Sequence, residues 1–239
     1  MSSLEIVARL DQVVDEYAGR SRLMNEPVTA ERAKMFVYQH RQNTRFRNSV
    51  CKLKVATNCP IWDVKLGILE ACTEEIVSDV EFGDGRPHWK VLEDLGVDIG
   101  LDRDEIRAQT LLPSTQVAWA AWETLCGNRH WLEGLVANTC AERYNIPGYG
   151  RGGLQEFGWF GDWRTQWQAL FDLSDDQVLF FKMHTEADIK HSDLGWNTVA
   201  EHAAELHMED AVVEACRVNL MVWEQYLDGI ATAGDALKN

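Results

Sequence analysis

The feature that most constrains the fold is a hydrophobic pattern that repeats every three to four residues along almost the whole chain. Leu4, Val7, Leu10 and Val14 are one example, and this spacing places apolar side chains on one face of a helix. The alternation typical of strands is scarce, and most of the five prolines stand between periodic segments. The sequence therefore predicts an all-α fold.

The periodic pattern divides into a series of expected helices. They cover about 3–18, 30–56, 61–80, 88–97, 102–109, 114–126, 130–145, 162–171, 175–193, 196–206 and 209–231. Ser174 and Gln177 form an expected capping box, Gly195 is an expected helix stop, and the glycine-rich segment 146–161 predicts a long loop. No internal repeat or linker is visible, so residues 1–239 are expected to form a single domain, a bundle of about seven to eight main helices.

Composition and charge limit the partners. A net charge of −15 over 239 residues argues against nucleic acid or an anionic membrane as partner. The N-terminal residues lack the basic and apolar regions of a signal peptide, and no stretch approaches the ~18 apolar residues of a membrane span. The six cysteines are scattered without a C-x-x-C pair, which favours reduced thiols. We therefore expect a cytoplasmic protein.

One segment has a polar pattern that suggests metal chemistry. His184, Asp188 and His191 fall at i, i+4 and i+7, so they share one face of the expected helix. Two imidazoles and a carboxylate on one stripe suit iron, manganese or zinc. The competing interpretation is structural, because a histidine on an apolar helix face is more often a hydrogen-bonded core residue than a ligand.

Further donors come from two other segments. Glu81 and His88 flank a glycine-rich turn that can direct both side chains toward one point. Glu142 lies among small apolar residues, where a buried acid needs a partner. Alternatively, Glu81 is a solvated acid at a helix end and His88 simply follows Pro87.

Together these donors make a mixed nitrogen and oxygen set. Its members are Glu81, His88, Glu142, His184, Asp188 and His191. Three carboxylates nearly neutralise two divalent cations, and such a set with open positions suits iron and dioxygen. Structural zinc would favour four closed ligands, usually with cysteine, and the chain has no cysteine cluster.

Candidate substrate-binding residues come from aromatic and cationic positions. Trp159 and Trp163 recur at i+4 beside the glycine-rich segment, as an aromatic wall over the metals or as bundle core. Four residues lie on a roughly common helix face, where Arg45 or Arg41 would clamp a carboxylate: Tyr38, Arg41, Arg45 and Asn48. The alternative for that face is a solvated charged surface.

The donor pattern resembles a known superfamily. The pattern is Glu81-x6-His88, then Glu142, then His184-x3-Asp188-x2-His191. In an all-α chain it resembles the haem-oxygenase-like diiron oxidases and oxygenases, relatives of the thiaminase-II and pyrroloquinoline-quinone-synthase fold. The resemblance implies a haem-oxygenase-like bundle, a homodimer, and the six residues as ligands of two ferrous ions that activate dioxygen as cosubstrate. It makes Glu81, Glu142 and Asp188 the expected catalytic residues.

The resemblance also implies a reaction class. We expect a non-haem diiron oxygenase or oxidase acting on a small amine or amino acid in specialised-metabolite biosynthesis, with N-oxygenation slightly favoured. One alternative is oxidative C–C cleavage or desaturation of an amino acid or fatty acid at the same site. Others are a small-molecule-binding protein and a metal-free, thiaminase-like hydrolase with Cys126 or Cys140 as a low-pKa nucleophile.

Overall fold

The computed structural model describes residues 1–148 and 158–238, apart from the side chains of residues 187, 190, 191, 193 and 194. Within these residues the regular elements are helices, with one isolated antiparallel bridge between Asp79 and Arg86. In chain order they are α1 (Ser3–Tyr17), α2 (Arg22–Asn25), α3 (Ala30–Phe46), the π-helical segment η1 (Arg47–Cys51), α4 (Lys52–Asn58), α5 (Trp62–Ile76), α6 (His88–Asp98), α7 (Arg103–Ala108), α8 (Pro113–Gly127), α9 (Trp131–Arg143), α10 (Gly158–Phe171), α11 (Leu179–Leu206) and α12 (Glu209–Ala236). The predicted all-α bundle is confirmed, with more helices than the main ones expected.

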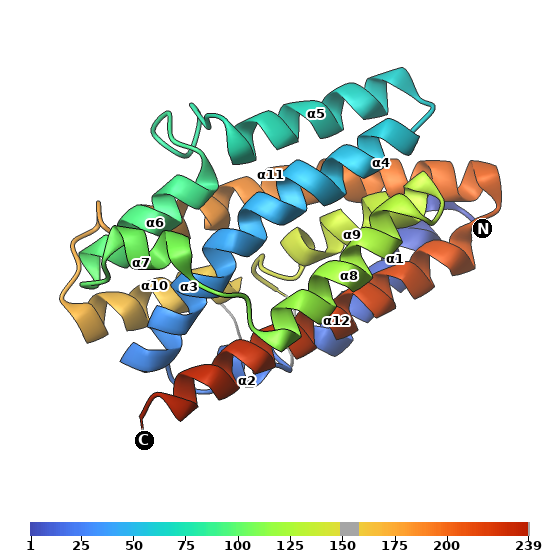
Figure 1. Cartoon of the computed structure of the whole chain (residues 1–239). Coiled ribbons are helices and arrows are strands. Elements are labelled where there is room, and N and C mark those ends of the chain that lie inside the picture. The colour runs from blue at the N-terminus through green and yellow to red at the C-terminus, as the bar shows by residue number, and fades with distance from the viewer. Residues whose placement is uncertain (149–157, 239) are drawn as a thin grey trace.

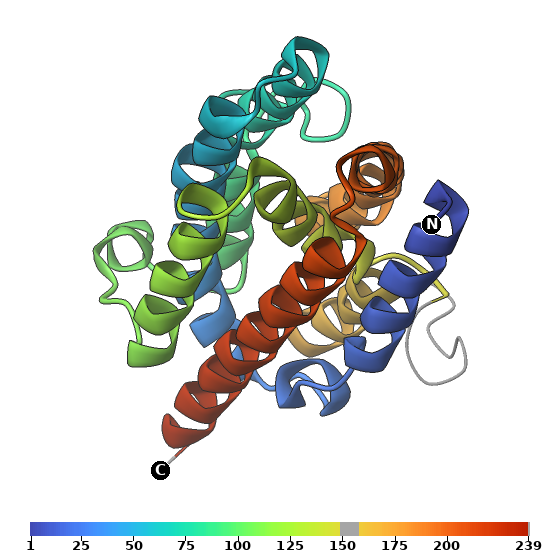
Figure 2. The same cartoon turned by 90° about the vertical axis from the view of Figure 1, so that its right-hand side faces the viewer.

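Helix α9 lies at the centre of the bundle, against α4, α8, α11 and α12 (Figure 1; Figure 2). Ten of its thirteen residues are buried, which is why its sequence has little polar surface. A Cβ added at Gly134 would come within 2.7 Å of the Val55 side chain, so a glycine is needed where α4 packs closest. Helix α1 packs on α11 and α12, and α5 forms one edge of the molecule (Figure 1).

Helix α11 is longer than the sequence pattern predicted. The segments 175–193 and 196–206 are one continuous helix, so the prediction that Gly195 stops a helix is wrong. A Cβ at Gly195 would lie 2.5 Å from Thr139 Oγ1, which means that this glycine serves the packing of α11 on α9. Ser174 and Gln177 are hydrogen-bonded at 3.0 Å, but they form a turn, and α11 begins at Leu179.

Helix α5 ends earlier than predicted, at Ile76 instead of about residue 80. Beyond it the chain turns back on itself: Gly85 N donates to Asp79 O at 2.8 Å, and Asp79 pairs with Arg86 in the isolated bridge. This turn brings the start of α6 beside the last turn of α5.

The long helix predicted over 30–56 is confirmed, with one local change. The π-helical segment η1 joins α3 and α4 without a break. A π turn contains one residue more than an α turn and therefore rotates the faces of the helix on either side of it; such segments are frequent at functional sites. Among the described residues, no helix is long and apolar enough to cross a membrane.

Candidate metal centre

A cavity lies between α3–η1–α4 on one side and α9, α10, α11 and α12 on the other, with the end of α5 beside it. It contains about 620 Å³ of space not filled by atoms, partly open to solvent. Its charged and imidazole-bearing lining residues are His40, Arg47, Lys52, Glu75, Glu142, His184 and Asp188. The described part of the molecule therefore brings three carboxylates to one enclosed space.

His88 lies just behind this cavity and is held by two carboxylates. Its Nε2 lies 2.9 Å from Asp79 Oδ2, and its Nδ1 lies 3.0 Å from Glu75 Oε2. Nδ1 is buried and makes no hydrogen bond of good geometry with the described residues. Burial disfavours the charged ring, but the charge of Glu75 and the hydrogen bond to Asp79 outweigh it and raise the pKa of His88 to about 10. The ring therefore presents Nδ1 toward Glu75.

Asp79 positions His88 and is itself fixed by the turn after α5. Its Oδ1 accepts a 2.8 Å hydrogen bond from Phe82 N, and its Oδ2 accepts from His88. Burial opposes ionisation, yet these hydrogen bonds lower the pKa of Asp79 to about 2. A carboxylate on the far nitrogen of a histidine is the usual support of a metal-ligating ring. The sequence analysis did not identify Asp79, although an aspartate that follows a helix and can accept from the backbone of the next turn is a recognisable signal.

Glu75, not Glu81, is the acid that α5 contributes to the cavity. Glu75 is buried, and its Oε2 accepts a 3.0 Å hydrogen bond from Asn48 Nδ2. Burial favours the neutral acid, but His88 and Lys52 lower the pKa of Glu75 well below its usual value. Glu81 is exposed and does not line the cavity, because the helix ends at Ile76 and the following turn directs residue 81 outward. The structure therefore does not place Glu81 beside the other candidate ligands, and its role as a metal ligand stays a prediction.

A signal for Glu75 was present in the sequence. Ile68, Cys72 and Glu75 follow each other at i, i+4 and i+7 and are the buried residues of α5. An acid that continues the apolar stripe of a helix is expected to be buried and therefore to need a charged partner.

Glu142 lines the cavity as predicted, and its partner is a buried lysine. Lys52 Nζ lies 3.0 Å from Glu142 Oε1 and 3.7 Å from Glu75 Oε1. Burial disfavours the ammonium, but the two carboxylates raise the pKa of Lys52 above its usual value. Lys52 thus joins α4 to both acids and partly neutralises them.

His184 and Asp188 enter the cavity from α11. His184 Nδ1 lies 2.7 Å from Phe180 O and therefore carries the proton, which places the lone pair of the neutral ring on Nε2. Asp188 Oδ2 accepts a 3.0 Å hydrogen bond from Asn145. Burial and the nearby charge of Glu142 raise the pKa of Asp188 well above its usual value. The third residue of the stripe, His191, has its side chain outside the described ones.

The candidate donor atoms are of the types that bind a metal, but the described side chains are not yet placed to hold one. The rings of His88 and His184 are 4.9 Å apart between centroids, so the two imidazoles share one side of the site. Three carboxylates and two imidazoles suit iron. The Nδ1 of His88 lies 3.0 Å from Glu75 and would have to give up its proton to ligate a metal there. Among the described side chains, no three His, Cys, Asp or Glu residues are arranged so that they could hold a metal ion as they stand.

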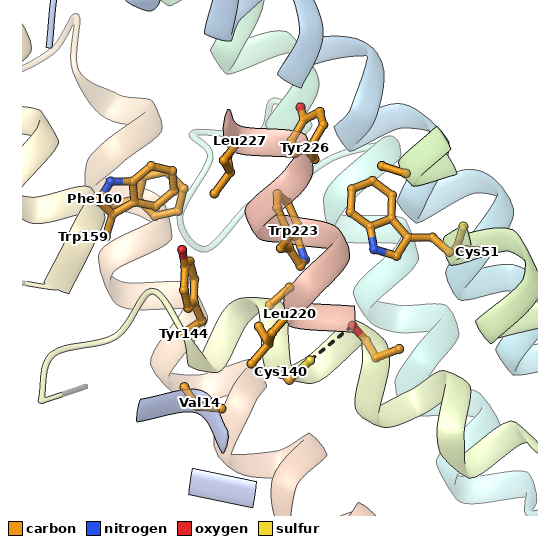
Figure 3. Packing of buried hydrophobic residues seen from close by; sticks show 14 of the residues in the cluster. Val14, Cys51, Cys140, Tyr144, Trp159, Phe160, Leu220, Trp223, Tyr226 and Leu227 are labelled. Carbon is orange, nitrogen blue, oxygen red and sulfur yellow. Dashed lines mark hydrogen bonds between the residues drawn. The ribbon is translucent and has the colours of Figure 1, made fainter. Parts of the chain in front are cut away.

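Only one of the four predicted substrate-binding residues reaches the cavity. Trp159 lines it, beside Phe160, and Figure 3 shows both rings across from Trp223. Trp163 is 1% exposed and belongs to the aromatic core. The remaining two predicted residues, Tyr38 and Arg45, are on α3.

Tyr38 and Arg45 lie on the opposite face of the helix from the cavity. Tyr38 Oη donates a 3.4 Å hydrogen bond to Glu105, and the exposed Arg45 lies over the ring of Trp89, 5.5 Å from its centroid. Of the predicted face, Asn48 lines the cavity and Tyr38 and Arg45 do not, because the rotation of a helix about its axis cannot be read from one amphipathic stripe with charges on two sides.

The cavity face of this helix is a polar stripe of which the sequence analysis identified only Asn48. His40, Thr44, Asn48 and Lys52 follow each other every four residues and all line the cavity. His40 is fully buried, and this burial lowers its pKa to about 3, so the ring is neutral; its Nδ1 lies 3.2 Å from Tyr226 Oη. A stripe of hydrogen-bonding residues inside a long helix was the available signal.

Two solved structures have the same fold. A domain of unknown function with a heme oxygenase-like fold from Shewanella denitrificans is 16% identical, with 100% of this chain and 96% of that chain covered and a TM-score of 0.74. A CADD-like protein of unknown function from Nostoc punctiforme is 13% identical, with 99% and 97% covered and a TM-score of 0.72. These likenesses confirm the haem-oxygenase-like fold.

The sequence itself matches a family model. No protein of curated function matches the chain. Residues 69–224, more than half of the chain, match the model described as "Iron-containing redox enzyme". That range contains Glu75, His88, Glu142, His184 and Asp188. The chain therefore belongs to the family of iron-containing redox enzymes.

Proposed function

We propose that this protein is a non-haem diiron oxidase or oxygenase that oxidises a small amino acid or amine with dioxygen. The observation that carries the proposal is the convergence of Glu75, Glu142 and Asp188 with His88 and His184 around one cavity, in a chain of the iron-containing redox enzyme family. Glu75, His88 and His184 would hold one iron. Glu142 and Asp188, with the predicted His191, would hold the second.

The chain's own residues prepare these ligands. When bound, ferrous iron supplies the electrons that reduce dioxygen. Asp79 fixes the His88 ring, the Phe180 carbonyl fixes the tautomer of His184, and Asn145 orients Asp188. Lys52 holds Oε1 of Glu142, which leaves Oε2 of that carboxylate as the oxygen that would bind a metal. Trp159 and Phe160 cover the cavity with apolar surface, which excludes water from the reacting atoms.

A hydrolase of the thiaminase type is not favoured. All six cysteines are buried, and neither Cys126 nor Cys140 lines the cavity. A hydrogen bond with Cys51 and burial raise the pKa of the Cys126 thiol, which is the reverse of what a nucleophile needs.

A second candidate function is oxidation of a fatty acid by the same site. A more apolar cavity, lined by Val64, Ile68 and Leu135, shares Lys52 and Glu142 with the first. An aliphatic chain in this second cavity would reach Glu142. Of the reactions on an amino acid or amine, N-oxygenation stays the slightly favoured prediction, and product analysis decides between it and C–C cleavage or desaturation.

Iron content and dioxygen uptake test the proposal. The protein is loaded anaerobically with ferrous iron, and dioxygen consumption is followed with a panel of amino acids, amines and fatty acids. We expect about two irons per chain and uptake triggered by one substrate class. His184→Ala should abolish uptake, whereas His202→Ala, on the same helix but bonded to Glu205, should not. A wild-type protein that binds no iron and consumes no dioxygen with any panel member rejects the proposal.

A further inference from the structure

Arg47 is a cavity-lining cation whose charge is not matched by a carboxylate. Its guanidinium lies over the rings of Trp122 and Trp223, with Cζ 5.1 and 4.8 Å from their centroids. Nη2 donates one long hydrogen bond of 3.4 Å to Ala137 O, and Nε is buried without a hydrogen-bond partner. Within the described residues no Asp or Glu pairs with it. Arg47 is partly buried, and its buried Nε has neither a hydrogen-bond partner nor a counter-ion among the described residues, which points to an anionic ligand.

The neighbouring cations on the same helix are already committed. Lys52 pairs with Glu142, and Arg41 pairs with Glu93 at 2.9 Å, outside the cavity. Arg45 is exposed. Of these cations, Arg47 is therefore the one that is directed to the cavity and still has N–H groups to donate.

The surroundings of Arg47 favour a carboxylate. Because indole rings stack on the guanidinium, its N–H edge is the part left to bind an anion, and this edge matches a carboxylate in a two-point contact. Asn43, one turn earlier, also lines the cavity; its Oδ1 accepts from Trp119 Nε1 at 3.1 Å, which leaves its NH₂ group as a second donor.

We propose that Arg47, assisted by Asn43, binds the carboxylate of the substrate, so that the substrate is an amino acid and not a simple amine. This inference rests on the function proposed above. Arg47 lies against α8 and α12, whereas Glu75, His88 and His184 come from α5, α6 and α11. A substrate anchored at Arg47 would then lie with its body between Trp159, Phe160 and Trp223, whose rings Figure 3 shows. Its reactive end would point toward the metal ligands.

Binding to the wild-type protein tests the ligand class. Tryptophan fluorescence is suited to this, because Trp122 and Trp223 touch the guanidinium. The full chain, metal-free and loaded with Mn²⁺, is titrated with the twenty standard amino acids and octanoate. Each amino acid that binds is compared with its primary amide and its decarboxylated amine, and octanoate is compared with octanamide. We expect the carboxylate to bind at least tenfold more tightly than either analogue. Equal affinity, or no carboxylate binding in either form, overturns the inference.

Variants locate the contact. Arg47→Met should weaken binding of the carboxylate at least tenfold and leave the amide unchanged, while Arg47→Lys should keep part of the affinity. Arg45→Met is the matched control, because it removes the same charge from an exposed position two residues earlier. Wild-type affinity for the carboxylate in Arg47→Met contradicts the proposal. Melting curves show whether each variant is folded. The comparison of acid with amide is made on the wild-type protein, so it does not depend on the folding of any variant.

The two proposals fail separately. The titrations use neither iron nor dioxygen, so carboxylate binding through Arg47 without iron-dependent dioxygen uptake would reject the oxidase and keep the anchor. Dioxygen uptake that is equally strong with an amine and unaffected by Arg47→Met would keep the oxidase and reject the anchor.

Discussion

At the scale of single residues, each candidate ligand depends on a neighbour that fixes its direction. His88 is fixed by Asp79, and Glu75 by Asn48 and Lys52. These contacts explain why the site is built of buried groups that would otherwise be costly to keep away from water.

The assignment of Glu75 in place of Glu81 leads to a direct comparison. Glu75→Gln replaces an anionic ligand by a neutral amide, and we expect the affinity for ferrous iron to fall by at least about tenfold. Glu81→Gln changes the charge equally at an exposed position and should leave iron affinity unchanged. Anaerobic competition with a chromophoric chelator measures both. Loss of iron in Glu81→Gln with retention in Glu75→Gln would reverse the assignment.

Lys52 should contribute most to the free energy of unfolding when no metal is bound. Lys52→Met leaves Glu75 and Glu142 without their shared cation, and breaking such a buried pair costs about 3–5 kcal/mol. We therefore expect a lower free energy of unfolding in the presence of a chelator.

Added Mn²⁺ replaces the lost positive charge in this variant, so it should raise the melting temperature of Lys52→Met more than that of the wild type. Equal melting temperatures of the two proteins in chelator would show that the ion pair contributes nothing.

At the scale of elements, the site depends on where α5 ends and on where α11 continues. The end of α5 places Glu75 beside His88, and the unbroken α11 carries His184 and Asp188 along α9.

A pair of glycine substitutions tests the packing of α11. In Gly195→Ala the new Cβ would meet Thr139 Oγ1 at 2.5 Å and Cγ2 at 2.6 Å, so no rotation of Thr139 avoids the contact. We expect the free energy of unfolding to fall by about 1–3 kcal/mol. Gly67→Ala meets nothing within 4 Å and should stabilise α5 by about 0.5–1 kcal/mol. Urea denaturation measures both, and a neutral Gly195→Ala would contradict the described contact.

The sequence predicted those features that follow from the residue pattern of a single helix. The all-α fold and the inward direction of His184, Asp188 and Glu142 follow from periodicity and spacing. Glu75 and Glu81 could not be distinguished, because the end of α5 is set by the turn at Asp79, which depends on a partner on α6. The cavity-facing residues of α3, His40 and Thr44, were missed because Tyr38 and Arg45 are as polar as the residues that line the cavity.

At the scale of the whole molecule, a second charged cluster ties helices together away from the cavity. Glu93 on α6 is buried and accepts from Arg41 on α3 and from Arg103 and Arg107 at α7, at 2.7–3.2 Å. Burial opposes its ionisation, but hydrogen bonds from the arginines lower the pKa of Glu93 to about 2.

This cluster predicts a pH dependence of stability. Because the pKa of Glu93 is lower in the folded protein than in the unfolded chain, its stabilising effect is complete above about pH 5 and is lost as the pH falls toward 2. Glu93→Gln should lower the free energy of unfolding by about 1.5–3 kcal/mol at neutral pH. The difference from wild type should shrink between about pH 5 and pH 3, by urea denaturation. A difference that is constant over this range would show that Glu93 is not held ionised.

The central claim is that carboxylates and imidazoles from α5, α6, α9 and α11 together bind iron. The most direct measurement is anomalous diffraction at the iron edge from crystals loaded anaerobically with ferrous iron. We expect two peaks in the cavity, one beside Glu75, His88 and His184 and the other beside Glu142 and Asp188. An iron-loaded crystal with no peak at these residues, or with its peak beside Glu81, would contradict it.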